Sequence, residues 1–122
     1  MENEFVDYST ALALKELGFD KDCFGHYVDG TLDLITTDIN DYPPMYVEVI
    51  KAPLYQQAFK WFREKYELHA EIIVQLGFKH WNAQILPSGR WLKSTEKKGF
   101  KTYEEAELAC LRKLIEIVKE NL

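Results

Sequence analysis

Apolar residues in the second half of the chain change their spacing twice, and each change predicts a different kind of element. From Pro53 the apolar positions recur every three or four residues, which predicts an amphipathic helix with Pro53 at its first position. From Leu68 they alternate with polar positions, as in strands. Turn residues follow Leu86, so that residues 68–97 are expected to form a three-stranded meander.

The last stretch of the chain returns to helical spacing. Thr102 and Glu105 have the spacing of a capping box, in which each side chain satisfies a backbone N–H at the helix start. Ala106, Cys110 and Leu114 then recur on one face. This pattern predicts a long C-terminal helix with one buried stripe.

The first helix is expected to be short. Ser9 or Thr10 is the expected N-cap, and the helix should reach about Leu17. Gly18 then supplies the left-handed residue that commonly ends a helix.

A β-hairpin is predicted after this helix. Asp29-Gly30 lies between two β-prone runs, and both positions of such a turn need positive φ. We therefore expect strands at 23–28 and 31–36. The Tyr42-Pro43-Pro44 stretch forces extended backbone, and residues 45–50 alternate like another short strand.

The order of these elements predicts an α+β fold. It comprises an N-terminal helix and β-hairpin, then a helix, a three-stranded antiparallel meander and a C-terminal helix packed on the sheet. We expect one domain over residues 1–122, with an acidic helix-plus-hairpin subregion at 1–50 and an α-β-β-β-α subregion at 51–122.

Charge is distributed unevenly between these subregions. The whole chain has a net charge of −5. Residues 1–50 hold eleven acidic and two basic residues, whereas residues 51–122 hold nine acidic and thirteen basic residues. Such asymmetry can point to a polyanionic partner, and the acidic N-terminal half could instead dock a basic protein.

The basic residues concentrate between positions 79 and 101, where aromatic residues are interleaved. Cations can neutralise phosphates and aromatic rings can stack on bases, so this segment is a candidate nucleic-acid surface. The alternative is that the tryptophans pack in the core and the lysines solvate an edge strand. The candidate residues are Lys79, Trp81, Arg90, Trp91, Lys93, Lys97, Lys98 and Lys101.

Three stretches resemble small proteins encoded by phages and mobile elements of gut anaerobic bacteria. They are Ala11 to Phe19, with the pattern A-x-x-L-K-E-L-G-F; Ala52 to Glu64, with A-P-x-x-Q-x-A-x-K-W-x-R-E; and Tyr103 to Ala106 with the helix that follows. The resemblance implies an accessory protein of a mobile element. It brings no catalytic residues and no established activity.

The second half also resembles known nucleic-acid-binding domains in its element order. Residues 53–121 follow the helix–strand–strand–strand–helix order of the double-stranded-RNA-binding domain. The pattern from Gly99 to Ala106 resembles the strand-to-helix joint of three-stranded-sheet DNA-binding domains, including the arm-binding domains of tyrosine integrases. The last helix opens with Glu104 and Glu105, where a duplex-RNA binder needs lysines, and this disfavours duplex RNA.

Signals for catalysis are weak. Cys23 and His26 have the spacing of one metal-ligand pair, but a structural zinc site needs four ligands. We therefore predict no metal, no cofactor and no catalytic residue. Scattered carboxylates leave a small metal-dependent hydrolase or nuclease as an alternative.

A non-enzymatic binding module is the function that these patterns favour. Its partner is a protein or a nucleic acid, and a homodimeric protein-interaction module that binds no nucleic acid is another interpretation. The N-terminus lacks the basic and apolar regions of a secretory signal, and no apolar run is long enough to cross a bilayer. Cys23 and Cys110 are expected to be buried free thiols, so we expect a cytoplasmic protein.

Overall fold

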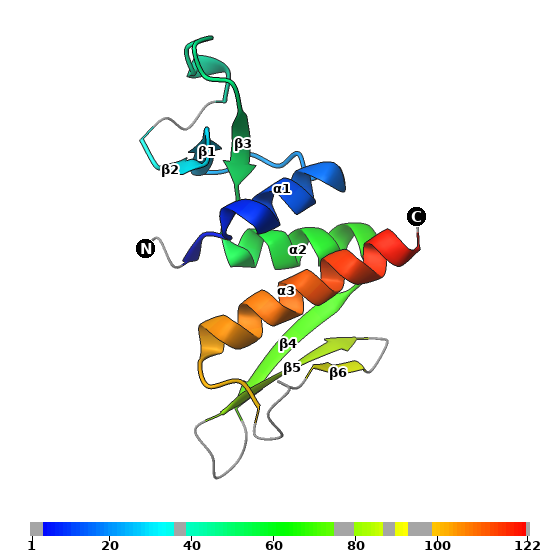
Figure 1. Cartoon of the computed structure of the whole chain (residues 1–122). Helices are drawn as coiled ribbons and strands as arrows, with labels where there is room; N and C mark the ends of the chain where they lie inside the picture. The colour runs from blue at the N-terminus through cyan, green and yellow to red at the C-terminus, as the bar shows by residue number, and fades with distance from the viewer. Residues whose placement is uncertain (1–3, 36–38, 75–79, 87–89, 93–98, 122) are drawn as a thin grey trace. The chain divides into compact units, whose positions relative to one another are not determined.

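A computed structural model describes residues 4–35, 39–74, 80–86, 90–92 and 99–121. The elements follow the order α1-β1-β2-η2-β3-α2-β4-β5-β6-α3, which confirms the α+β fold (Figure 1). The chain divides into two compact units, residues 1–58 and residues 59–122, and the boundary lies inside α2. No helix in the described part of the chain has the length and apolar character that a membrane crossing needs.

The first unit contains one helix and one antiparallel sheet. Its sheet has the strand order β2-β1-β3, so β1 is central. Helix α1 contacts β3. The bounds of these elements are α1 Tyr8–Glu16, β1 Gly25–Val28, β2 Thr31–Asp33, the 3-10 turn η2 Ile39–Asp41 and β3 Val49–Ala52.

Asp7 caps α1, so the prediction of Ser9 or Thr10 as the N-cap is wrong. The Asp7 carboxylate accepts a hydrogen bond from the backbone N–H of Thr10 at 2.8 Å. Asp, Ser and Thr are all good caps, and three such residues lie within four positions, so local sequence could not separate them. The end of the helix is as predicted. Gly18 has φ of 98°, and the N–H of Phe19 donates to the carbonyl of Leu14 at 3.0 Å.

Asp29 and Gly30 form the predicted hairpin turn, with φ of 48° and 90°. The strands are shorter than the alternation predicts. β1 starts at residue 25, β2 ends at residue 33, and β3 spans 49–52 in place of 45–50. Residues 45–47 alternate in sequence but form no ladder, and their side chains are exposed.

The core of the first unit lies between α1 and the sheet. The Tyr27 hydroxyl reaches through it and donates to the carbonyl of Val6 at 2.6 Å. Burial raises the pKa of Tyr27, and Asp7 adds to the shift. The apolar residues buried in this unit include Phe5, Val6, Ala11, Leu14, Phe19, Tyr27, Ile50 and Ala52.

Helix α2, Tyr55–Tyr66, begins two residues later than predicted. Pro53 lies before the helix, and its carbonyl accepts from the N–H of Val6 at 3.0 Å. The side-chain oxygen of Gln57 instead accepts from the N–H of Leu54, at 3.1 Å. This contact satisfies one of the backbone donors that a helix start leaves unpaired.

The second unit contains the predicted meander and the predicted last helix. Strands β4 His69–Val74, β5 Trp81–Leu86 and β6 Arg90–Leu92 pair antiparallel in chain order. Helix α3, Tyr103–Glu120, contacts β5 and β4. The fully buried Ala83 and Ile85 lie on β5, and the buried stripe of α3 includes Ala106, Cys110, Leu111 and Leu114.

Thr102 is the N-cap of α3, as predicted. Its hydroxyl accepts from the backbone N–H of Glu105 at 3.1 Å. The Glu105 carboxylate accepts from the N–H of Lys101 at 3.3 Å, one residue before the cap. Half of the predicted capping box is therefore present, and Glu105 satisfies the adjacent donor instead.

Candidate functional site

A surface hollow of about 550 Å³ in the first unit is the strongest candidate for a binding site. Three separate stretches of the chain line it: the segment entering β1, the turn η2, and β3. The β1–β3 ladder brings two of them together, because it places His26 directly opposite Lys51, and η2 contacts β3. The lining residues are Asp22, Cys23, Phe24, His26, Ile39, Asn40 and Lys51.

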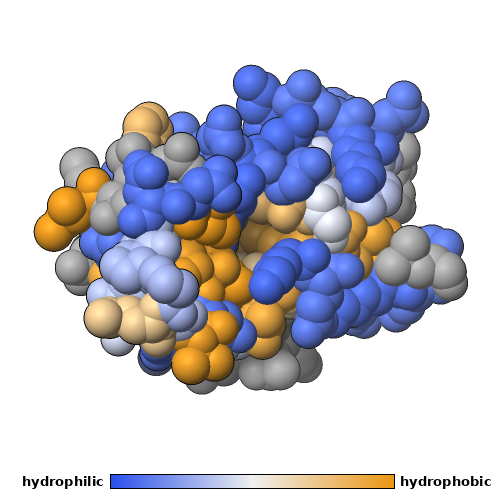
Figure 2. Space-filling model, turned by 90° about the horizontal axis from the view of Figure 1, so that it is seen from above, coloured by the Kyte–Doolittle hydropathy of each residue, from blue (hydrophilic) through white to orange (hydrophobic). Residues whose placement is uncertain are grey.

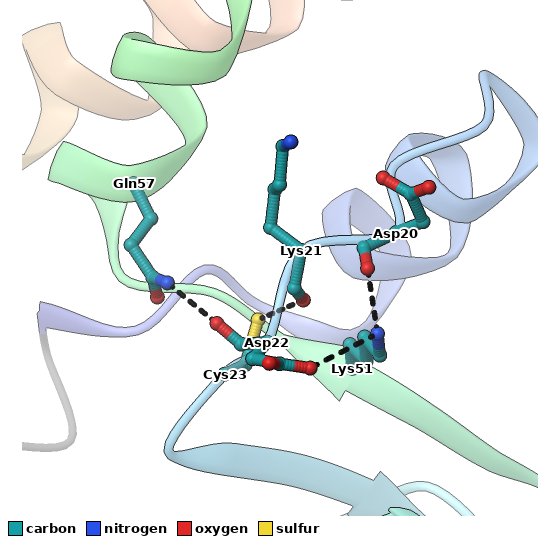
Figure 3. Close-up of polar contacts among 6 residues, drawn as sticks. All are labelled: Asp20, Lys21, Asp22, Cys23, Lys51 and Gln57. Carbon is teal, nitrogen blue, oxygen red and sulfur yellow. Dashed lines mark hydrogen bonds and ion pairs between the residues drawn. The ribbon is translucent and has the colours of Figure 1, made fainter.

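Lys51 is the cation of this hollow, and its ammonium group is already engaged. It donates to the backbone carbonyl of Asp20 at 2.7 Å and lies 3.9 Å from the carboxylate of Asp22 (Figure 3). Only 22% of the Lys51 side chain is exposed, whereas that of Asp22 is fully exposed. Since Asp22 is fully exposed to solvent and the contact is as long as 3.9 Å, the ion pair is weak, and the Asp22 carboxylate stays available to an incoming cation.

The backbone around Asp22 is held from the other side by α2. The amide of Gln57 donates to the backbone carbonyl of Asp22 at 2.8 Å (Figure 3). The carbonyls of Asp20 and Asp22 therefore both accept hydrogen bonds from side chains. Phe24, two residues further, exposes 66% of its surface at the hollow. A fixed backbone thus presents one carboxylate and one aromatic ring to solvent.

Cys23 is the reactive residue type of the hollow, but its environment keeps it protonated. The thiol is buried and donates to the carbonyl of Lys21 at 3.3 Å (Figure 3). Burial raises the pKa of Cys23 to about 12, with opposing contributions from Lys51 and Asp22. A nucleophile or metal ligand must be a thiolate, and this environment disfavours that form.

His26 lies at the inner wall of the hollow and is 1% exposed. Its ring meets Tyr42 edge-on at a centroid distance of 5.3 Å, and the Tyr42 hydroxyl donates to the Asp33 carboxylate at 2.7 Å. Asp33 lies opposite His26 in the β1–β2 ladder. This arrangement is a packed aromatic and hydrogen-bonded cluster. His26, which has the sequence spacing of a metal ligand relative to Cys23, is thus packed within this cluster.

An exposed apolar turn, Pro43–Val47, adjoins this cluster. The N–H of Tyr46 donates to the carbonyl of Pro43 at 3.3 Å, and the Tyr46 ring packs edge-on against Tyr42. All five residues are exposed, with Met45 at 76% and Val47 at 94%. Figure 2 shows hydrophobic side chains reaching the surface among hydrophilic ones. Five consecutive exposed apolar or proline residues are unusual, and such patches commonly mark interaction sites.

Asp29 and Glu48 fasten the C-terminal end of this turn. The Asp29 N–H donates to the Glu48 carbonyl at 2.8 Å, and the Glu48 N–H donates to the Asp29 carboxylate at 2.7 Å. The Tyr8 hydroxyl donates to the Glu48 carboxylate at 2.5 Å, and this bond raises the pKa of Tyr8. The exposed turn is therefore anchored by hydrogen bonds to the hairpin and to α1.

Substitution of Asp29 tests whether its carboxylate anchors the exposed turn. Asp29→Gly keeps a residue that tolerates positive φ but removes the carboxylate acceptor. We expect it to lower the free energy of unfolding by roughly 1 kcal/mol, because one charge-assisted hydrogen bond is lost. Urea unfolding followed by circular dichroism measures the change, and a stability equal to that of the wild type would contradict the anchoring role.

The described residues of the chain include no group of three or more His, Cys, Asp or Glu side chains that could hold a metal ion. Cys23 and His26 both line the hollow, yet each is committed to the contacts given above.

Half of the predicted nucleic-acid residues lie outside the described residues: Lys79, Lys93, Lys97 and Lys98. Lys101 is exposed. Trp81 is half-buried and packs edge-on against Tyr103 at 5.3 Å. Arg90 and Trp91 are placed by their backbones alone, opposite Ile85 and Gln84 of β5. The nucleic-acid surface remains a prediction.

Sequence reasoning did not identify Asp22, Phe24 or Lys51 as site residues. In the sequence, Asp22 is one of many acidic residues, and Phe24 and Lys51 belong to no recognisable motif. The single local signal is that two acidic residues, Asp20 and Asp22, directly precede the predicted strand that contains Phe24.

Comparison with known proteins adds no relatives. No protein-family profile, curated protein or solved structure matches this chain.

Proposed function

We propose that this chain is a non-enzymatic binding module that takes up a basic segment of a partner protein on its acidic first unit. The observation that carries the proposal is that one hollow is lined by both a fully exposed carboxylate, Asp22, and an exposed aromatic ring, Phe24. The resemblance to small proteins of phages and mobile elements supports an accessory role of this kind.

The chemistry of the hollow favours an arginine or lysine side chain as its guest. A guanidinium group can lie over the exposed ring of Phe24, where the negative face of the ring attracts it. The same group can pair with the Asp22 carboxylate, which Lys51 engages only at 3.9 Å. Arginine also sheds its hydration shell more readily than lysine, and this suits a partly enclosed site.

The partner segment is expected to have apolar residues next to its basic residue. The turn Pro43–Val47 is connected to the hollow through the Tyr42 ring, which contacts both His26 and Tyr46. The exposed side chains of Met45 and Val47 supply apolar area that one or two aliphatic residues of the partner can cover. We therefore expect a partner segment in which an arginine or lysine stands beside aliphatic residues.

The charge of the first fifty residues supports a protein partner over the other macromolecules. Eleven acidic residues against two basic ones repel both the phosphates of nucleic acids and anionic lipid head groups. The same field attracts a basic protein surface and accelerates its association at low salt.

Selection from a random peptide library displayed on phage tests the proposal with the full chain as bait. We expect enrichment of arginine or lysine next to aliphatic residues and depletion of acidic residues. An enriched peptide is then synthesised with a fluorophore, and its affinity is measured by fluorescence anisotropy.

Two substitutions in the hollow should weaken this peptide. Asp22→Asn is expected to reduce affinity about fivefold, and Phe24→Ala about tenfold, because both contacts lie at the guest position. Glu16→Gln removes the same charge from an exposed position on α1, outside the hollow, and serves as the matched control. Equal losses for Asp22→Asn and Glu16→Gln would indicate only a general charge effect and would refute the proposed site.

A further inference from the structure

Strand β4 presents an unpaired edge in the second unit. The sheet order is β4-β5-β6, so β4 has β5 on one side, and within the described residues no strand pairs with its other side. An unpaired edge exposes a row of backbone N–H and C=O groups that can accept another strand.

The sequence of β4 carries few of the features that protect an edge strand. Residues 69–74 read His-Ala-Glu-Ile-Ile-Val, with no proline and no lysine or arginine. Three β-branched residues end the strand, and such residues favour pairing. Ile73 and Val74 are 39% and 48% exposed. Glu71 is the one acidic residue of the strand, and the exposed edge beyond it is a platform for strand addition.

We propose that β4 pairs antiparallel with β4 of a second copy of this chain, with Ile72 opposite Ile72 of that copy. The two sheets then join into one sheet of the order β6-β5-β4-β4-β5-β6. This inference concerns the second unit and does not rest on the function proposed for the first.

Symmetry, strand length and charge together select this register, because only Glu71 or Ile72 on the axis pairs five residues of β4. Two identical antiparallel strands related by a two-fold axis perpendicular to the sheet must place one residue on the axis, since paired residues share a face. With Glu71 on the axis, two carboxylates would lie directly opposite each other, which is unfavourable. With Ile72 on the axis, Glu71 lies opposite Ile73, and Ala70 opposite Val74. This register pairs residues 70–74 without opposing two like charges.

The existing ladder shows that this register continues one apolar face. Ala70 pairs with Ile85, and Ile72 pairs with Ala83, and both of these β5 residues are fully buried. A two-fold axis perpendicular to the sheet keeps corresponding faces on the same side. The Ala70, Ile72 and Val74 positions of both copies therefore extend the apolar face of β5 across the new junction.

A second copy suits this edge better than an unrelated strand. The two edges are identical, so one contact pairs both of them and leaves no further edge at β4 for a third chain. Apart from Glu71 and His69, the strand offers no charge that would select a foreign sequence.

Substitution of the exposed Ile73 by an acidic residue in one variant and a basic residue in another tests the register. Ile73→Glu places a carboxylate opposite Glu71 of the other copy at two symmetric sites and should weaken the dimer about tenfold. Ile73→Lys is matched in size and exposure but places an ammonium group opposite Glu71, and should dimerise at least as well as the wild type. Light scattering coupled to size exclusion, from about 1 to about 500 µM, measures the mass, since small strand-mediated contacts associate weakly.

Cysteine cross-linking checks the same pairing independently. Ile72→Cys should form a disulfide-linked dimer under mild oxidation, because the two copies of position 72 face each other. Gln84→Cys, on the central strand β5, should not. The native Cys23 and Cys110 are buried, and the wild type oxidised in the same way measures the cross-linking that these two thiols cause. The proposal would be overturned if the wild type stayed monomeric over the whole range of protein concentration. It would also be overturned if Ile73→Glu and Ile73→Lys changed dimerisation equally. Circular dichroism confirms that each variant is folded.

Discussion

Gly99→Ala is expected to lower the free energy of unfolding by roughly 3 kcal/mol, whereas Gly30→Ala should lower it by only about 1 kcal/mol. Both glycines adopt positive φ, 89° at Gly99 and 90° at Gly30, so the backbone strain is the same. They differ in their surroundings. A Cβ at Gly30 meets nothing within 4 Å, but at Gly99 it would lie 2.9 Å from the carbonyl oxygen of Trp81.

The clash at Gly99 falls on backbone that cannot move away cheaply. Trp81 and Phe100 exchange two backbone hydrogen bonds of 2.8 Å, which join the segment before α3 to β5. A side chain at Gly99 must displace this pairing or the adjacent Asn82, whose side-chain oxygen would also lie 2.9 Å from the added Cβ. Urea unfolding of both variants gives the comparison, and equal destabilisation would show that the close approach at Gly99 is unimportant.

Both cysteines are expected to react about a thousandfold more slowly with iodoacetamide at pH 8 than an unhindered thiol does, because almost no thiolate is present. Burial raises the pKa of Cys23 to about 12, and burial together with Glu107 raises that of Cys110 to about 12. Mass spectrometry of the intact protein follows the labelling, and the urea-unfolded chain serves as the reference for full reactivity.

The same shifts give stability a dependence on alkaline pH. Between the ordinary thiol pKa and about 12, the folded chain holds thiol protons that the unfolded chain has released. The two thiols therefore favour the folded state below this range, and their contribution is lost as the pH rises through it. A Cys23→Ala, Cys110→Ala double variant should show a flatter decline in melting temperature above about pH 9. Rapid labelling of either thiol in the folded protein would contradict its burial.

The elements predicted best from sequence are those whose signals are local and agree with one another. Thr102 caps α3, and the apolar stripe of this helix follows at helical spacing. The Asp29-Gly30 turn has the two positive φ values that its sequence requires. In each case the capping or turn residue and the apolar pattern indicate the same boundary, so tertiary contacts had nothing to override.

Predictions failed where several local solutions were nearly equal or where distant contacts decided. Asp7, Ser9 and Thr10 are all competent caps, and the hydrogen bond of Asp7 prevails. Residues 45–47 alternate like a strand, yet β3 begins only at Val49, where the ladder with β1 starts. The ladder fixes this boundary, and sequence alternation does not reveal it.

The hollow could not be located from sequence because it is built by strand pairing. Its lining comes from residues 22–24, 26, 39–40 and 51, which are brought together by the opposition of His26 and Lys51 and by the contact of η2 with β3. The uneven charge of the chain was visible in the sequence and indicated a charged partner. It did not reveal which carboxylate lines the same hollow as an exposed ring.

The most direct test of the proposed binding site is a nuclear magnetic resonance titration of the isotope-labelled full chain with an arginine-containing peptide from the library selection. We expect saturable shifts of the amide signals of Asp22, Phe24, Asn40 and Lys51, extending to Met45–Val47 and absent from α3. Asp22→Asn should weaken these shifts, while Glu16→Gln leaves them unchanged. Saturable shifts confined to the second unit, or none around the hollow, would contradict the proposed site.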